Sequence, residues 1–295
     1  MNKVVLAHIS LFTLNLLYTI SYFVVKGVSP KYIDASGFVF VRAAGATILF
    51  WLVSLFLKYE KVEKQDLKKL LFACLFGVVF NQLAFFNGLV YTTSINTSII
   101  MTSAPLMALP MSYWMLKEKI SASKILGVVV GFIGALLIIL QKEKLYNATN
   151  PLLGNILIFT NAAVFTFFLV YVKPMMVKYS PFTVLKWSFL FGTIVLIPVG
   201  APELAKIGMD YTTFPLEIWW SIGYVVIGIT FFTFLLNMFA LKQVSPSIVS
   251  AYIFTQPLLT AILSWIIEGK IMNLTSAFAC VLIFVGVYFV SFKKS

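Results

Sequence analysis

The chain has 295 residues, of which 61% are hydrophobic and 11% are charged, and its mean hydropathy is +0.98. Soluble domains carry about a quarter charged residues, so this composition excludes an ordinary water-soluble protein. The net charge of +12 does not indicate a nucleic-acid partner, because the lysines lie in short segments between apolar runs, as in membrane proteins.

Ten apolar runs follow one another along the chain, and each is close to the roughly 20 residues that cross a bilayer. Backbone groups in lipid must be paired within their own segment, so each run is predicted to be a helix. The predicted spans are Val4–Val25, Ile33–Leu57, Leu67–Leu89, Thr93–Leu116, Ser123–Leu140, Leu152–Val172, Phe182–Val199, Glu217–Leu241, Ser247–Ile267 and Leu274–Phe292. The predicted fold class is an all-α membrane protein with ten transmembrane helices.

The ten spans divide into two halves of five, residues 1–141 and 151–295, that resemble each other. Pro105 in the first half matches Pro257 in the second, and Glu118 matches Glu268 just past the end of the same span. Because five is odd, two copies of the unit cross the membrane in opposite directions. Inverted repeats of this kind are typical of transporters that bind substrate near the midplane between the halves.

The lysines predict the orientation of the chain. With ten spans, the side that holds both termini carries 14 lysines outside the spans, and the other side carries 6. The lysine-rich side faces the cytoplasm, so we expect cytoplasmic termini. The expected location is the cell membrane, which in a bacterium is the inner membrane.

Arg42 is the only arginine of the chain and lies inside the second predicted span. A charged side chain at that depth costs about 2.5–3.5 kcal/mol on insertion scales, so it should face the protein interior or a wet cavity. Two interpretations stay open. Arg42 binds an anionic group of a substrate through its guanidinium fork, or it holds the bundle together through helix-end carbonyls or Asp34.

Uncharged polar side chains at mid-span depth are the other candidates for substrate binding. Amides and hydroxyls in lipid need partners, so each of them either joins helices or lines a cavity. As a group, they predict a polar cavity at the centre of the bundle. The candidates are Asn15, Tyr18, Asn81, Gln82, Asn161 and Gln256.

Pro105 and Pro257 are expected to remove a backbone hydrogen bond in the middle of a span and to bend it. A matching bend in each half is a candidate gating hinge. The alternative is a pair of ordinary kinks.

The sequence carries no signature of hydrolytic, nucleotide-binding or metal chemistry. We therefore expect no enzyme activity, no metal and no cofactor. No Asp or Glu lies in the middle of a predicted span, which favours facilitated exchange or export down a gradient over a proton-driven mechanism. Coupling through a group that the sequence does not identify stays open as the alternative.

A set of short motifs recurs along the two halves: Lys26, Arg42, Ser-Ala-Pro-Leu at 103–106, Lys-Glu-Lys at 117–119, Gln-Pro-Leu at 256–258 and Glu268. With these motifs the chain resembles the drug/metabolite transporter superfamily, in its ten-helix EamA-like branch. In the second half the seventh span carries Lys186 but no arginine, which departs from the fuller pattern of the first half. The resemblance implies alternating access, cytoplasmic termini, and export of amino acids, related metabolites or drugs, although the family also includes importers.

The sequence thus predicts a carrier of small organic metabolites that exports amino acids or related compounds by alternating access. Its expected partners are the small-molecule substrate and the lipid bilayer. Two alternatives stay open: an uptake carrier for an anionic metabolite, and a membrane protein that does not transport. The oligomeric state is not predicted.

Overall fold

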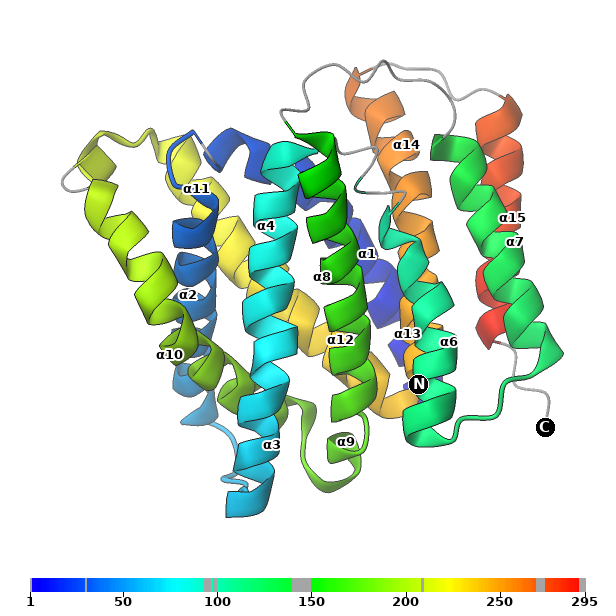
Figure 1. Ribbon diagram of the computed structural model, residues 1–295, viewed down its shortest axis with the longest axis horizontal. Coiled ribbons are helices and arrows are strands. Elements are labelled where there is room, and N and C mark those ends of the chain that lie inside the picture. The colour runs from blue at the N-terminus through cyan, green and yellow to red at the C-terminus, as the bar shows by residue number, and fades with distance from the viewer. Residues whose placement is uncertain are drawn as a thin grey trace.

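The computed structural model describes residues 2–29, 31–92, 97, 100–139, 150–207, 210–268 and 274–291. Within these ranges the chain forms helices joined by short connections, and no residue is in a β-strand (Figure 1). The start of α1 and the end of α15 lie at the same end of the bundle (Figure 1). A chain that crosses a membrane an even number of times has both of its ends on the same side.

Each predicted span overlaps one helix or a continuous run of helical segments in the described residues, although α6 covers only the later part of the fourth span and α10 continues past the predicted end of the seventh. The single helices are α1 (Lys3–Val28), α2 (Ala35–Ser54), α6 (Ser103–Leu116), α7 (Ala122–Ile139), α8 (Pro151–Val172), α10 (Pro181–Ile207) and α15 (Leu274–Ser291). The composite runs are α3–η1–α4 (Lys64–Cys74, Leu75–Phe80, Asn81–Tyr91), α11–η3–α12 (Leu216–Tyr224, Val225–Phe232, Thr233–Gln243) and α13–η4–α14 (Pro246–Ala251, Tyr252–Phe254, Thr255–Glu268). Short helices α9 (Met175–Lys178) and η2 (Asp210–Thr213) lie in connections. The predicted first residue of the fourth span, Thr93, and residues 141–149 between the halves lie outside the described residues.

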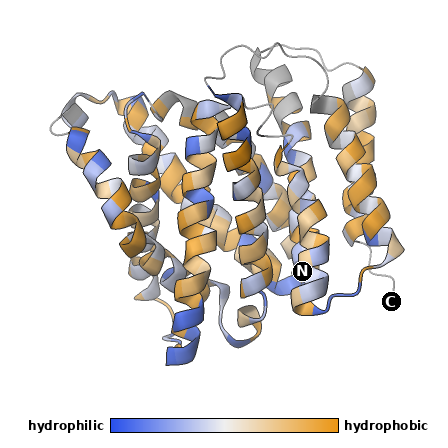
Figure 2. Cartoon of the chain, viewed as in Figure 1, coloured by the Kyte–Doolittle hydropathy of each residue, from blue (hydrophilic) through white to orange (hydrophobic). Residues whose placement is uncertain are grey.

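Length and composition support membrane crossing. Within the described ranges, six helical stretches are long and apolar enough to span a bilayer, and α7 and α15 contain shorter apolar runs. Apolar residues dominate the helices over most of their length, whereas polar residues gather toward their ends (Figure 2). The chain is a multi-pass, all-α membrane protein.

Polar caps fix where several helices begin. The side chain of Asn2 accepts a hydrogen bond from the Val4 backbone N–H at 3.0 Å. Asn150 does the same for Leu153 at 3.3 Å, with Pro151 in the first turn of α8. An N-cap of this type satisfies one of the unpaired N–H groups of a first turn. The first and sixth spans therefore begin in the same way.

Helices at equivalent positions of the two predicted halves pack against each other: α7 against α15, and α2 against α10. Other neighbours come in pairs that the same correspondence exchanges. The contact of α4 with α8 has its counterpart in α1 with α12, and that of α6 with α8 in α1 with α14. A duplicated five-helix unit predicts this pattern, because a contact made by a helix of one copy recurs at the equivalent helix of the other copy.

The third and eighth spans contain segments of π-helix, η1 and η3, in place of uninterrupted α-helix. Such segments are rare and occur often at functional sites. In η3 the hydroxyl of Thr230 donates to the carbonyl of Val225, five residues earlier, at 2.8 Å. Both π-segments immediately precede a helix, α4 or α12, that contributes polar side chains to the interior.

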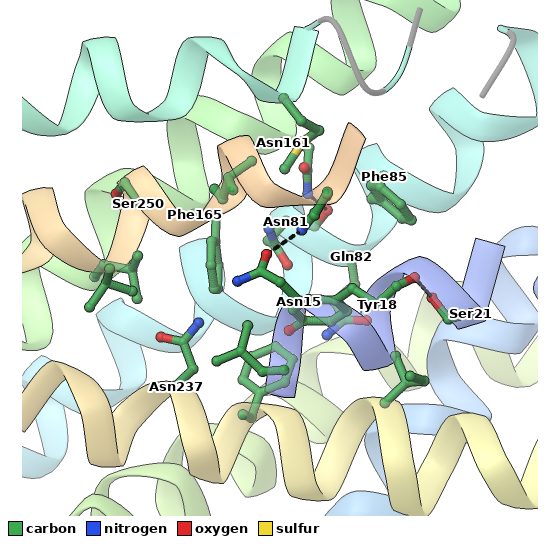
Figure 3. Close-up of a pocket in the computed structure, with 18 of the residues that line it drawn as sticks. Asn15, Tyr18, Ser21, Asn81, Gln82, Phe85, Asn161, Phe165, Asn237 and Ser250 are labelled. Atoms are coloured by element: carbon green, nitrogen blue, oxygen red, sulfur yellow. Dashed lines mark hydrogen bonds between the residues drawn. The ribbon is translucent and has the colours of Figure 1, made fainter. Parts of the chain in front are cut away.

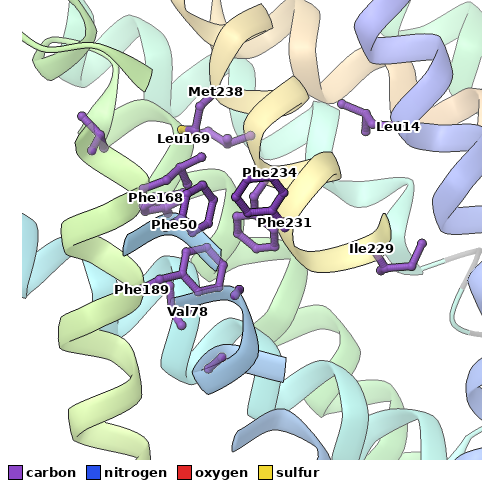
Figure 4. Packing of buried hydrophobic residues seen from close by; sticks show 14 of the residues in the cluster. Leu14, Phe50, Val78, Phe168, Leu169, Phe189, Ile229, Phe231, Phe234 and Met238 are labelled. Atoms are coloured by element: carbon purple, nitrogen blue, oxygen red, sulfur yellow. The ribbon is translucent and has the colours of Figure 1, made fainter. Parts of the chain in front are cut away.

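Aromatic packing joins α2, α8, α10, η3 and α12 (Figure 4). The ring of Phe50 lies 4.6 Å from that of Phe231, and Phe189 lies 5.0 Å from Phe234, measured between centroids. All four side chains are buried. Each aromatic pair contributes about 0.5–1.5 kcal/mol beyond the burial of its area, so this cluster holds helices of both halves together.

Glycines allow α7 and α15 to approach closely. A Cβ atom added at Gly286 would lie 2.5 Å from the backbone nitrogen of Gly131, and one at Gly127 would lie 2.6 Å from the carbonyl oxygen of Gly286. Small residues at a membrane helix interface permit this backbone contact.

Candidate functional site

A cavity lies inside the bundle, where side chains of several helices meet. Side chains from α1, α4, α8, α12 and α13 converge on it (Figure 3). Helices of both predicted halves therefore contribute to one space. The residues that sequence reasoning singled out for substrate binding all line this cavity: Asn15, Tyr18, Arg42, Asn81, Gln82, Asn161 and Gln256.

Asn15 joins the first helix to α14. Its Nδ2 donates to the backbone carbonyl of Leu11 at 2.7 Å, and its Oδ1 accepts a hydrogen bond from Gln256 Nε2 at 2.8 Å. Asn15 is 1% exposed and Gln256 is 6% exposed. Both amides thus take part in joining helices as well as in lining the cavity.

Asn161 joins α8 to the start of α4. Its Nδ2 donates to the backbone carbonyl of Asn81 at 2.8 Å. Its Oδ1 is buried and accepts no hydrogen bond from the described residues. Since the Nδ2 bond fixes the orientation of the amide, an acceptor oxygen is left without a donor at the cavity wall.

Arg42 lies on α2 with 3% of its surface exposed. Its Nε donates to the hydroxyl oxygen of Thr230 at 3.0 Å, and its guanidinium carbon lies 4.4 Å from the ring centroid of Phe86. Asp34 instead caps α2, accepting from the Ser36 N–H at 3.1 Å. No carboxylate in the described part of the chain forms an ion pair with Arg42. The sequence left helix-end carbonyls and Asp34 open as structural partners of Arg42. A pairing of Arg42 with Asp34 is therefore wrong.

Tyr18 lies on α1, and its hydroxyl oxygen is 3.1 Å from Thr233 Oγ1 of α12. The backbone carbonyl of Tyr18 accepts a hydrogen bond from Ser21 at 2.6 Å (Figure 3). Phenylalanines supply much of the remaining wall, among them Phe85 and Phe165. Arg42 is the one charged side chain among the lining residues in the described ranges. The cavity therefore combines one cation, several amides and hydroxyls, and aromatic surface.

Comparison with known sequences identifies the family of this chain. The sequence model of the EamA-like transporter family matches residues 5–140 and, a second time, residues 152–292. The chain belongs to the EamA-like transporter family. It is a membrane transporter, and such proteins are generally not enzymes.

Relatives of this EamA-like chain carry the name "uncharacterized transporter". One from Archaeoglobus fulgidus is 24% identical over 266 residues, which cover 90% of this chain and 92% of the relative. YyaM from Bacillus subtilis is 24% identical over 275 residues, which cover 92% of this chain and 85% of the relative. A protein of known crystal structure shares the fold with a TM-score of 0.72 at 15% identity, over 96% of both chains.

Asn237 is a cavity residue of this EamA-like chain that sequence reasoning missed. It lies on α12, is 3% exposed, and its Oδ1 accepts no hydrogen bond from the described residues. Figure 3 shows its side chain directed from α12 toward the other lining residues. An amide within the apolar run Phe-Leu-Leu-Asn-Met-Phe was the available signal, and the reasoning applied to Asn161 would have found it.

Both prolines lie within the helical run of their span, close to an interruption of the α-helix. Pro105 is the third residue of α6, and Pro257 is the third residue of α14, directly after the 3₁₀ segment η4. The helical run of each span is interrupted just before its proline, by a turn at Thr102 before α6 and by η4 before α14. The two positions match, and their role as gating hinges stays a prediction.

Polar contacts join helices at the end of the bundle that holds both termini, and the contact between Glu118 and Ser247 joins the two halves. Lys173, which follows α8, donates to the carbonyl of Val244 at 2.8 Å and to that of Leu241. Glu118, which follows α6, accepts from Ser247 at 3.2 Å and pairs with Lys124. Burial lowers the pKa of Lys173, and the charge of Glu118 opposes that shift. These contacts tie α8 to α12 and α6 to α13.

Proposed function

We propose that this chain exports amino acids or related small carboxylate-bearing metabolites, and that the central cavity is the substrate site. The observation that carries the proposal is Arg42, a buried cation at the cavity wall without a carboxylate partner among the described residues. A cation so placed needs a counter-charge, and a substrate carboxylate supplies one.

The proposed mechanism is alternating access by two five-helix halves, residues 1–141 and 151–295. The two separate matches of the family model and the paired helix contacts support this division. Because the cavity draws side chains from both halves, rocking one half against the other would expose it to each side in turn. Pro105 and Pro257, at matching helix starts, are the proposed gating positions.

The remaining cavity residues have proposed roles that follow from their chemistry. Asn161 and Asn237 offer unpaired acceptor oxygens to a substrate donor such as an ammonium group. Asn15, Tyr18, Asn81, Gln82 and Gln256 complete the polar wall. The phenylalanines favour an apolar or aromatic side chain on the substrate.

We propose the cell membrane as the location, the inner membrane in a bacterium, with both termini in the cytoplasm. The lysine distribution supports this orientation. Uptake of an anionic metabolite is a second candidate, which the unpaired charge of Arg42 favours equally.

Counterflow into liposomes tests the proposal. Purified protein is reconstituted with each unlabelled amino acid inside, and entry of the labelled form is followed. We expect saturable exchange for one class, and loss of at least about tenfold in Arg42→Ala and in Arg42→Lys, because lysine keeps the charge but lacks the planar fork.

Lys186→Gln is the matched control. Lys186 is also a cation within a span, but its Nζ lies 4.2 Å from the ring centroid of Trp51 and away from the cavity lining. Exchange that persists in folded Arg42→Ala would contradict the proposed role of Arg42. Folded wild-type protein that exchanges no carboxylate-bearing solute would contradict the proposed substrate class.

A further inference from the structure

We propose that Thr230 is the positioning residue of the anion site: it holds Arg42 Nε, so that the two terminal nitrogens, Nη1 and Nη2, face the cavity as a bidentate fork. This inference rests on the proposed function, in which Arg42 binds a carboxylate. It assigns a role to a residue outside the cavity lining, in the π-helical segment η3.

The hydrogen bonds of Thr230 set the direction of the contact. Its hydroxyl has one proton, and this proton is donated to the carbonyl of Val225 at 2.8 Å. The oxygen is therefore left as an acceptor, which receives Arg42 Nε–H at 3.0 Å. Thr230 is fully buried, so water does not compete for either bond. The π-helical backbone thus fixes the hydroxyl, and the hydroxyl fixes Arg42.

Phe86 supplies a second constraint from another helix. The guanidinium carbon lies 4.4 Å from the centroid of the Phe86 ring, which supports one face of the group. Bonded at Nε and held at one face, the planar guanidinium has little freedom to rotate. Arg42 lines the cavity, and within the described residues neither Nη1 nor Nη2 donates a hydrogen bond. The edge that remains available is the one that matches two carboxylate oxygens.

This geometry separates carboxylates from neutral solutes of the same shape. A carboxylate accepts two parallel N–H bonds and neutralises the charge, whereas a carboxamide offers one oxygen and no charge. Without the Thr230 hydroxyl, Arg42 Nε has to find another acceptor and the fork turns. The affinity for carboxylates should then fall while the charge of the cavity is unchanged.

Arg42 is the only arginine of the chain, which permits a test that needs no knowledge of the substrate. Phenylglyoxal condenses with guanidinium nitrogens, so mass spectrometry of the purified full-length protein reports modification of this one residue. The probe ligand is benzoate, an aromatic carboxylate suited to a cavity with phenylalanine walls, and its neutral isostere benzamide is the control. We expect benzoate, and not benzamide, to protect wild-type Arg42.

The variants are Thr230→Val, Thr230→Ala and Thr230→Ser. Thr166→Val is the matched control, because Thr166 is equally buried and donates to a helix carbonyl but does not line the cavity. In the valine and alanine variants, half-protection should need about tenfold more benzoate or higher, as expected for a lost hydrogen bond to a charged group. Thr230→Ser and Thr166→Val should behave like the wild type.

The outcomes separate the two proposals. If benzoate protects folded Thr230→Val or Thr230→Ala as well as it protects the wild type, the role of Thr230 is overturned and the anion site stands. If benzoate gives no protection in the wild type, the carboxylate site of the proposed function is overturned, and this inference falls with it. If phenylglyoxal does not modify folded wild-type Arg42, the exposure of Nη1 and Nη2 to the cavity is wrong.

Discussion

Two asparagines at the cavity wall differ in how well their amides are satisfied. Asn15 uses both ends of its amide, toward Leu11 and Gln256. Asn237 has a buried Oδ1 that accepts no hydrogen bond from the described residues. A buried acceptor without a donor costs about 1–3 kcal/mol, so Asn237 lowers stability at the place where a substrate would supply the donor.

This contrast predicts opposite effects of the same substitution. Asn237→Leu should raise the stability of the protein by about 1 kcal/mol, because it removes an unsatisfied polar group. Asn15→Leu should lower it by about 1–2 kcal/mol, because it removes two hydrogen bonds between and within helices. Thermal unfolding of the purified proteins in detergent measures both changes.

The companion measurement is counterflow, in which Asn237→Leu should transport less than the wild type despite its greater stability. A destabilised Asn237→Leu protein would mean that Oδ1 is satisfied in the folded state. Unchanged transport would mean that Asn237 does not meet the substrate.

The seven predicted cavity residues could be found from the sequence for one physical reason. A polar group within an apolar span must turn away from lipid, so polar side chains on several helices converge inside the bundle. The partners of those groups could not be found in the same way. Arg42 is paired with Thr230, 188 positions away, and nothing in the local sequence distinguishes that contact from one with Asp34 or with helix-end carbonyls.

At the scale of elements, the close backbone contact between α7 and α15 leads to a prediction about stability. Gly286→Ala places a methyl group 2.5 Å from the backbone nitrogen of Gly131. Neither backbone can yield easily, so we expect a loss of about 1–3 kcal/mol, the usual cost of overpacking. The change in thermal unfolding in detergent measures it.

Gly223→Ala is the control for this substitution, because an added Cβ there meets no atom within 4 Å. The control should leave the unfolding temperature nearly unchanged. If Gly286→Ala unfolds at the same temperature as Gly223→Ala, the close approach of α7 and α15 is incorrect.

The existence of the helices was predictable, but their internal geometry was not. Long apolar runs separated by lysine-bearing connections predict spans whatever their detailed backbone. The π-helical segments Leu75–Phe80 and Val225–Phe232 carry no such signal, since their residues are ordinary apolar ones. Pro105 illustrates the same limit: a proline predicts an irregularity, and only the fold shows that a helix begins two residues before it.

At the scale of the whole molecule, the lysine distribution predicts which end of the bundle faces the cytoplasm. Single cysteines can test it in a background of Cys74→Ala and Cys280→Ala. Ser121→Cys lies on the lysine-rich side, and Thr212→Cys lies on the other side; both positions are exposed. In intact cells a membrane-impermeant maleimide should label Thr212→Cys, and should label Ser121→Cys only after permeabilisation.

Labelling of Ser121→Cys in intact cells, with protection of Thr212→Cys, would reverse the proposed orientation. Labelling of both positions in intact cells would contradict the assignment of the two connections to opposite sides of the membrane. Either result would leave the cavity and its residues as described.

The paired π-segments have a consequence for which way the cavity residues face. A π-turn holds one residue more than an α-turn, and one residue of α-helix corresponds to a rotation of about 100°. Asn81 directly follows η1, and Thr233 directly follows η3. Without the extra residue, everything beyond each segment would be turned by that angle, and Asn81, Gln82 and Asn237 would point toward other neighbours. One surplus residue in each of two spans therefore decides which side chains a solute in the cavity would meet.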